Sequence, residues 1–215
     1  MSGVINRLHA DFLSGIDEVE ASLRLVNAAA VALETTQSGS TSEGRQSNAE
    51  VAHALREDLF RSRFPHAFLS AYGLFEFFLL CAYREALVAK PSLIGNRTVR
   101  GETFAVVADL PELLRTVAEG RARELAYQPL DELLGAIRKI FGVAVEPDER
   151  LRLLEIRETR NALTHNAGVA GRDYARLPDA VRRAEEGQSL LLDEVYRAES
   201  SSLLLGIAGR VRDAA

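Results

Sequence analysis

The chain has 215 residues, of which 47% are hydrophobic and 27% are charged, and its formal net charge is −5. This length and composition suit a soluble globular protein with its own core and exclude disordered, collagen-like and mucin-like chains. An acidic chain does not attract nucleic acid or anionic membrane through its overall field, so a polyanionic partner requires a local basic patch. Cys81 is the only cysteine, which excludes an internal disulfide and a cysteine-based zinc cluster and favours a reducing, cytoplasmic compartment.

The N-terminal region predicts one long amphipathic helix over residues 4–34. Its apolar residues recur at every third or fourth position from Ile5 to Leu33. The polar, glycine-containing stretch over 35–48 predicts a flexible linker. Residues 49–215 then predict a helical bundle, and we expect residues 1–215 to form a single domain. Polar and charged residues interrupt the first apolar positions, which argues against a signal peptide.

The second helical region covers residues 49–90 and is expected to break near Phe64 and Pro65, because proline disfavours helical geometry in the preceding residue. Its most apolar part, 67–83, is short for a bilayer span and contains Glu76, so we interpret it as a core helix and expect no membrane association. Further helices are predicted over 111–123, 129–141, 147–166 and from an Asp193 cap to Arg212, whereas 102–110 fits either an extended piece or a helix start. Strand signals are nearly absent, so the predicted fold class is all-α, an antiparallel helical bundle.

The known phosphate-binding, dinucleotide-binding, zinc-protease, serine-hydrolase and EF-hand motifs are absent, so we expect no cofactor and no metal site. The segment that carries candidate catalytic side chains is E-I-R-E-T-R-N-A-L-T-H-N-A-G over 155–168. On a helical wheel, one polar stripe carries Arg157, Asn161, Thr164 and His165. The predicted solvent face carries Arg152, Glu155, Glu158 and Thr159.

Arg160 falls on the apolar arc of this helix, beside Leu153, Ile156 and Leu163. An arginine there requires an anion, an acceptor or an interface, because an unpaired buried charge is costly. His165 lies in the last turn, where the helix dipole favours a protonated imidazole. A guanidinium and an imidazole can together cleave RNA without a metal. The 2′-hydroxyl attacks the adjacent phosphorus, histidine moves protons and arginine stabilises the developing charge.

The residues R-N-A-L-T-H-N-A-G, followed by Tyr174, resemble the signature of the HEPN superfamily, in the variant found beside RiboL-PSP-type domains. The resemblance is close over 147–177, and it rests only on helix order and composition over 68–87 and 188–212. It implies an all-α bundle and a metal-independent ribonuclease of the kind found in toxin–antitoxin, phage-defence and CRISPR systems.

The resemblance implies that Arg160 and His165 are catalytic and come from both subunits of a homodimer. Asn161 and Asn166 would support them, and RNA would be the substrate. An antitoxin or another neighbouring-gene product is a further expected partner. The expected contacts to substrate are Arg157, Thr164, Arg172 and Tyr174.

The spacing of one arginine and one histidine is not specific by itself, because Arg61 and His66 have the same separation, interrupted by Pro65. The context of the second pair, a continuous helix with an asparagine directly after the arginine, distinguishes it. Residues 150–183 also hold eight arginines against four acidic residues, a net charge of 8 − 4 = +4. Such a strip suits phosphate, unless the arginines are solvated or paired with acidic neighbours.

Glu76 is a charge within an apolar stretch, which is compatible either with pairing to Arg160 or Arg157 as a supporting residue or with a place at the edge of the apolar face. His9 and His53 are expected at the surface, and Cys81 is expected to be a small buried hydrophobe. Two alternatives to the nuclease remain. One is a non-catalytic HEPN module that binds RNA, a nucleotide or a partner protein, and the other is a helical scaffold.

Overall fold

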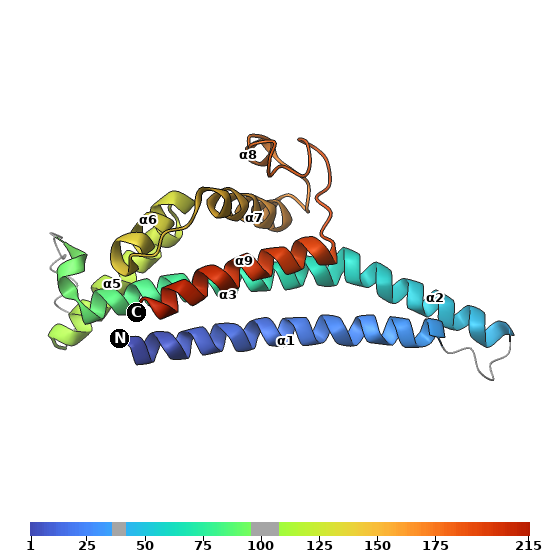
Figure 1. Ribbon diagram of the computed structural model, residues 1–215, viewed down its shortest axis with the longest axis horizontal. Coiled ribbons are helices and arrows are strands. Elements are labelled where there is room, and N and C mark those ends of the chain that lie inside the picture. Colours follow the sequence, from blue (N-terminus) through green and yellow to red (C-terminus); the bar gives the residue numbers. More distant parts are fainter. Residues whose placement is uncertain (36–41, 96–107) are drawn as a thin grey trace. The chain divides into compact units, whose positions relative to one another are not determined.

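The computed structural model describes residues 1–35, 42–95 and 108–215, and most of these residues are helical (Figure 1). Within these ranges the only β pairing is an isolated bridge between Val169 and Ser189. The prediction of an all-α helical bundle is therefore confirmed. The elements are α1 (Ser2–Thr35), α2 (Ser42–Asp58), the π-helix η1 (Leu59–Arg63), α3 (Phe64–Ala89), the 3-10 helix η2 (Pro91–Ile94), α5 (Leu110–Ala126), α6 (Leu130–Phe141), α7 (Pro147–His165), α8 (Arg172–Ala175) and α9 (Glu194–Asp213).

The helices after residue 108 begin where the sequence carries start signals. The backbone N–H of Tyr196 donates to Asp193 Oδ1 at 2.7 Å, which confirms the predicted cap of α9. Pro129 precedes α6 and Pro147 opens α7, positions where the missing proline N–H costs nothing. These local signals explain why the predicted helices agree closely with the observed ones.

The predicted flexible linker over 35–48 is wrong in its second half. Residues 36–41 lie outside the described residues, but α2 already begins at Ser42. Glutamate, arginine and glutamine within 42–48 have high helix propensity, and they outweigh the serines and the glycine. The two alternatives predicted for 102–110 concern residues that lie largely outside the described ranges, and α5 begins at Leu110.

The expected break near Phe64 and Pro65 appears as a π-helical segment, not as an interruption. The backbone N–H of Phe64 bonds to the Leu59 carbonyl, a wider turn than in an α-helix. Because Pro65 has no N–H to donate, a local change in the hydrogen-bond ladder is expected at this point. The helical path continues into α3.

One apolar window within residues 47–89 is long and hydrophobic enough to cross a membrane by length and composition, with a mean hydropathy of 1.4. Half of that window is buried inside the protein, and core helices of soluble proteins pass the same test. The window is thus weak evidence for a membrane span.

The described chain divides into two compact units. Unit 1 comprises residues 1–13, 74–150 and 204–215, and unit 2 comprises residues 14–73 and 151–203. In unit 1 the rings of Phe12 and Phe78 stack with centroids 5.8 Å apart, and the His9 ring meets Phe78 edge-on at 5.6 Å. The expected surface position of His9 is wrong, because the residue is buried, and burial lowers its pKa. Cys81 is buried as expected, and burial raises the pKa of its thiol.

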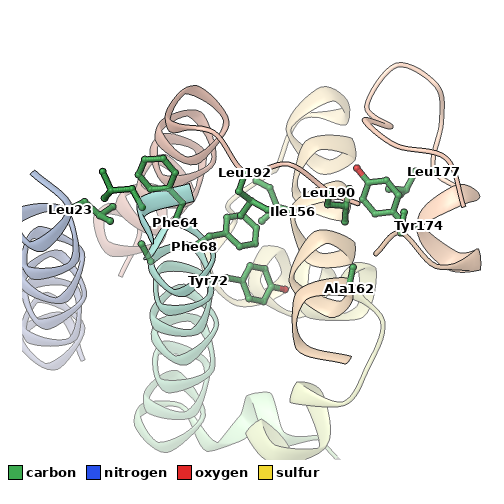
Figure 2. Packing of buried hydrophobic residues seen from close by; sticks show 13 residues of the cluster. Leu23, Phe64, Phe68, Tyr72, Ile156, Ala162, Tyr174, Leu177, Leu190 and Leu192 are labelled. Atoms are coloured by element: carbon green, nitrogen blue, oxygen red, sulfur yellow. The ribbon is translucent and has the colours of Figure 1, made fainter. Parts of the chain in front are cut away.

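The core of unit 2 lies around α3, α7 and the segment between α7 and α9. Figure 2 shows Phe68 and Tyr72 of α3 beside Ile156 of α7, with Leu190, Leu192 and Tyr174 from the connecting segment. An ion pair between the buried Arg197 and the partly exposed Glu20 joins α9 to α1 within this unit.

Candidate functional site

The candidate site lies at the C-terminal end of α7, whose last helical residue is His165. Ala167 and Gly168 both have positive φ angles, of 51° and 78°, so the chain turns sharply away from the helix axis there. The backbone N–H of Gly168 donates back to the Ala162 carbonyl at 3.0 Å and satisfies one of the helix's terminal carbonyls. The turn leaves His165 exposed at the rim of the helix end.

Arg160 is half-buried, and its guanidinium bonds an acceptor, as its position requires. Its Nη1 donates to Asn161 Oδ1 at 3.1 Å, and its Cζ lies 5.8 Å from the centre of the Tyr72 ring. The asparagine that follows the arginine in sequence therefore binds it directly.

A groove of about 420 Å³ opens beside this helix end. One side is formed by Asn161, His165 and neighbouring residues of α7, and the other by the segment that contains Arg172. The lining residues are Glu158, Asn161, Ala162, His165, Asn166, Gly171, Arg172, Asp173 and Tyr174. The structure thus brings together four of the predicted site residues, namely Asn161, His165, Asn166 and Arg172, with Tyr174 at the border.

The two sides of the groove approach closely at Gly171. A Cβ atom at this glycine would lie only 3.1 Å from Nδ2 of Asn166. The same Nδ2 atom donates to the Val169 carbonyl at 3.2 Å, so Asn166 holds the start of the second wall. Asn166 therefore has a structural bond as well as a place in the groove.

Four other predicted site residues do not line this groove. Arg160 reaches it only through its bond to Asn161, and Arg157 is half-buried elsewhere on the helix. The Thr164 hydroxyl donates to the Arg160 carbonyl at 2.8 Å, a bond within the helix. Glu76 is half-buried on α3 and belongs to unit 1, so its pairing with Arg160 or Arg157 stays a prediction.

Tyr174 borders the groove, so its expected contact with substrate stays a prediction, but its hydroxyl points into the protein interior. Tyr174 is 2% exposed, and its hydroxyl donates to Glu155 Oε1 at 2.8 Å. A hydroxyl bonded to a buried carboxylate in this way is committed to the protein interior. Tyr174 packs in the core of unit 2, as Figure 2 shows.

The predicted solvent face of α7 is also wrong, because Glu155 is 4% exposed and Thr159 is fully buried. Glu155 accepts hydrogen bonds from four side chains. Its Oε1 accepts from Thr159 Oγ1 at 2.7 Å, from the Tyr174 hydroxyl at 2.8 Å and from Arg183 Nε at 3.0 Å. Its Oε2 accepts from the Tyr196 hydroxyl at 2.8 Å. We call these five residues the Glu155 network.

Arg183 spreads its remaining donors over two further acceptors of unit 2. Nη1 donates to the Leu191 carbonyl at 2.7 Å and Nη2 to Thr159 Oγ1 at 3.2 Å. The guanidinium also lies over the Tyr196 ring, with Cζ 3.5 Å from its centre. Each nitrogen of the Arg183 guanidinium thus donates to a protein acceptor.

The two phenols of the Glu155 network are held in the neutral form. Burial, followed by the charge of Glu155, raises the pKa of Tyr174 to about 12 and raises the pKa of Tyr196 as well. A neutral phenol is the form that donates a hydrogen bond to a carboxylate, so these shifts agree with the geometry.

The basic strip over 150–183 is mostly neutralised within the chain. Five of its eight arginines form ion pairs, and the carboxylate partners are Asp131 for Arg150, Glu199 for Arg152, Asp173 for Arg176, Asp179 and Glu185 for Arg182, and Glu155 for Arg183. The carboxylates therefore balance most of the charge of the expected phosphate-binding strip. Arg172 lines the groove, and Arg160 bonds Asn161 at its edge.

Sequence reasoning missed the Glu155 network as a whole. Glu155 and Thr159 lie one turn apart, but their partners are 19 to 41 positions from Glu155 along the chain. A wheel drawn for one helix cannot reveal partners that arrive from other elements. The available signal was the position of Thr159 between Ile156 and Ala162, which are both buried.

No known protein family, curated protein or solved structure matches this chain. Among the described residues, no group of three or more histidine, cysteine, aspartate or glutamate side chains is placed to hold a metal ion. The groove itself offers an exposed imidazole, two asparagine amides and the Arg172 guanidinium, and the Arg160 guanidinium is bonded to Asn161 at its edge.

Proposed function

We propose that this chain is a metal-independent endoribonuclease of the HEPN type that acts as a homodimer, with Arg160 and His165 of each subunit as its catalytic pair. The observation that carries the proposal is the place of Asn161. It bonds the Arg160 guanidinium at 3.1 Å and lines the same groove as His165. One asparagine thus links the two groups that the sequence resemblance singles out.

The reaction follows from the chemistry of these groups. One His165 accepts the proton of the RNA 2′-hydroxyl as that oxygen attacks the adjacent phosphorus, and the imidazole of the second subunit donates a proton to the departing 5′-oxygen. Arg160 stabilises the charge that develops on the phosphoryl oxygens. The products are a 2′,3′-cyclic phosphate and a free 5′-hydroxyl, and Arg172 on the opposite wall holds a neighbouring phosphate.

The decisive experiment incubates the purified protein with single-stranded RNA in the presence of EDTA. We expect cleavage with 2′,3′-cyclic phosphate ends and no cleavage of DNA of the same sequence. Arg160→Ala and His165→Ala should each reduce the rate by about 10²- to 10⁴-fold, the usual contribution of a positioned proton donor or charge-stabilising group.

The chain contains its own control pair for these variants. Arg61 and His66 have the same spacing, but Arg61 is 79% exposed and pairs with Glu57, and the His66 Nδ1 atom bonds the Ser62 carbonyl at 2.7 Å. Arg61→Ala and His66→Ala should leave cleavage unchanged. Equal losses in both pairs would contradict the assignment of the site to α7.

The dimer can be tested by complementation. Arg160→Ala and His165→Ala proteins, each strongly impaired, should regain a small part of the activity when mixed, because a mixed dimer contains one intact guanidinium and one of the two imidazoles that the reaction uses. Light scattering on the same samples measures the oligomeric state. A monomeric protein with full activity contradicts the shared site.

The alternative function is a non-catalytic module that binds RNA or a nucleotide. It is favoured by Glu158 and Asp173, whose carboxylates line the groove and weaken its attraction for a phosphate chain. Binding of labelled RNA without cleavage, with affinity reduced in Arg172→Ala, is the outcome expected for this alternative.

A further inference from the structure

The second wall of the groove belongs to a segment that closes on itself. Between α7 and α9, the backbone N–H of Leu190 donates to the Gly168 carbonyl and that of Ala170 to the Gln188 carbonyl, both at 2.8 Å. The N–H of Gly187 returns to the Ala170 carbonyl at 2.9 Å. These bonds join the two ends of the segment 168–190, which we call the wall segment, and leave its middle to be held by side chains.

The middle of the wall segment is held by the Glu155 network. Tyr174 and Arg183 are its only members from that segment, and both bond Oε1 of Glu155 on α7. The backbone N–H of Arg183 also donates to the Tyr174 hydroxyl at 3.3 Å, which ties the two together. Arg183 further bonds Thr159 of α7 and lies over Tyr196 of α9. A single guanidinium therefore connects the wall segment to both helices.

The wall segment carries Arg172 and Gly171 into the groove. α8 has only four residues, Arg172–Ala175. It contains Tyr174, one of the two residues that bond this segment to Glu155. With Gly171 so close to Asn166, a small shift of the segment changes the width of the groove and the position of Arg172. This wall is thus bonded to α7 at Glu155, ten positions before His165 along the helix.

A buried ionic cluster adds little net free energy to folding, because the cost of desolvating the charges offsets much of their mutual attraction. It does orient the side chains that it contains, since each hydrogen bond to Glu155 fixes an angle as well as a distance. We infer that Glu155 and Arg183 are positioning residues: they fix the wall that carries Arg172 opposite His165 and thereby determine how tightly the groove holds an RNA phosphate. The role in RNA binding rests on the proposed function.

The first test concerns the wall segment alone. Arg183→Lys keeps the charge, but one ammonium cannot reach Glu155, Thr159 and Leu191 together or stack on Tyr196. Amide hydrogen exchange at Ala175, Leu177 and Arg182, whose N–H groups bond carbonyls in the middle of the wall segment, should become about tenfold faster or more, while exchange in α5 and α6 stays unchanged. Arg176→Lys is the matched control, because Arg176 lies on the same segment and its side chain is 70% exposed. Unchanged exchange in Arg183→Lys overturns the inference.

The second test separates positioning from a general loss of structure. Because Arg160 and His165 remain on α7, Arg183→Lys should raise KM about tenfold with little change in kcat, and Arg172→Ala should do the same. In the double variant Arg172→Ala/Arg183→Lys, KM should rise no further than in Arg172→Ala alone, since the wall acts through Arg172. Multiplying effects, or a fall in kcat at constant KM, overturn the inference. If the wild-type protein cleaves no RNA, the proposed function fails and the exchange experiment still decides the placement of the wall.

Discussion

Two faces of helix α7 carry polar side chains in opposite environments. On the buried face, the Glu155 carboxylate accepts from four donors and Thr159 has no exposed surface. On the groove face, His165 is exposed and Asn161 is half-buried beside it. Polarity alone therefore does not identify a site. Groups saturated by the protein hold it together, whereas an exposed imidazole beside a groove can act on a ligand.

The largest expected difference between the two faces is in stability. Glu155→Ala removes the common acceptor of Arg183 and three hydroxyls and leaves a largely buried guanidinium unpaired. We expect the free energy of unfolding to fall by about 3–5 kcal/mol, measured by urea denaturation. Glu57→Ala removes the partner of the exposed Arg61 and should cost less than about 1 kcal/mol. A small loss in Glu155→Ala means that the network does not hold the fold.

A smaller loss is expected from removing one donor of the network. Tyr174→Phe deletes only the hydroxyl that donates to Glu155, a bond to a charged acceptor that contributes about 1.5–3 kcal/mol. Tyr127→Phe is the control, because Tyr127 is 84% exposed, and its unfolding midpoint should match that of the wild type.

The advantage of the wild type over Tyr174→Phe should also depend on pH. The phenol pKa is about 12 in the folded chain and near 10 when unfolded, so the folded state retains its proton more strongly. By linkage, this contribution is fully present below pH 10 and is lost as the pH rises through about 12. Urea midpoints of the two proteins measured from pH 8 to pH 12 should converge at the alkaline end. A constant difference between them would show that burial and the Glu155 charge do not hold Tyr174 neutral.

The sequence predicted what depends on near neighbours and failed where distant elements meet. Asp193 caps α9 because its acceptor lies three residues from the amide that it binds. Arg160 was expected to need an acceptor, and that acceptor is the next residue, Asn161. Glu155 was placed in solvent because its partners Arg183 and Tyr196 come from 28 and 41 positions away. A helical wheel gives the angular position of each α7 side chain around the helix axis. Which side of the helix is buried depends on the elements that pack against it.

The smallest expected effect on stability is that of His165→Ala, on the groove face. His165 is exposed in the last turn of α7, and substitutions at such positions usually change the free energy of unfolding by less than about 0.5 kcal/mol. Under the proposed function, the same variant shows the full loss of RNA cleavage. A substitution on this face thus changes activity without changing stability, whereas Glu155→Ala changes stability. His66→Ala, at the matched exposed position, should change neither quantity. Should His165→Ala unfold at a clearly lower urea concentration than the wild type, the imidazole is part of the framework of α7, and the contrast between the two faces is lost.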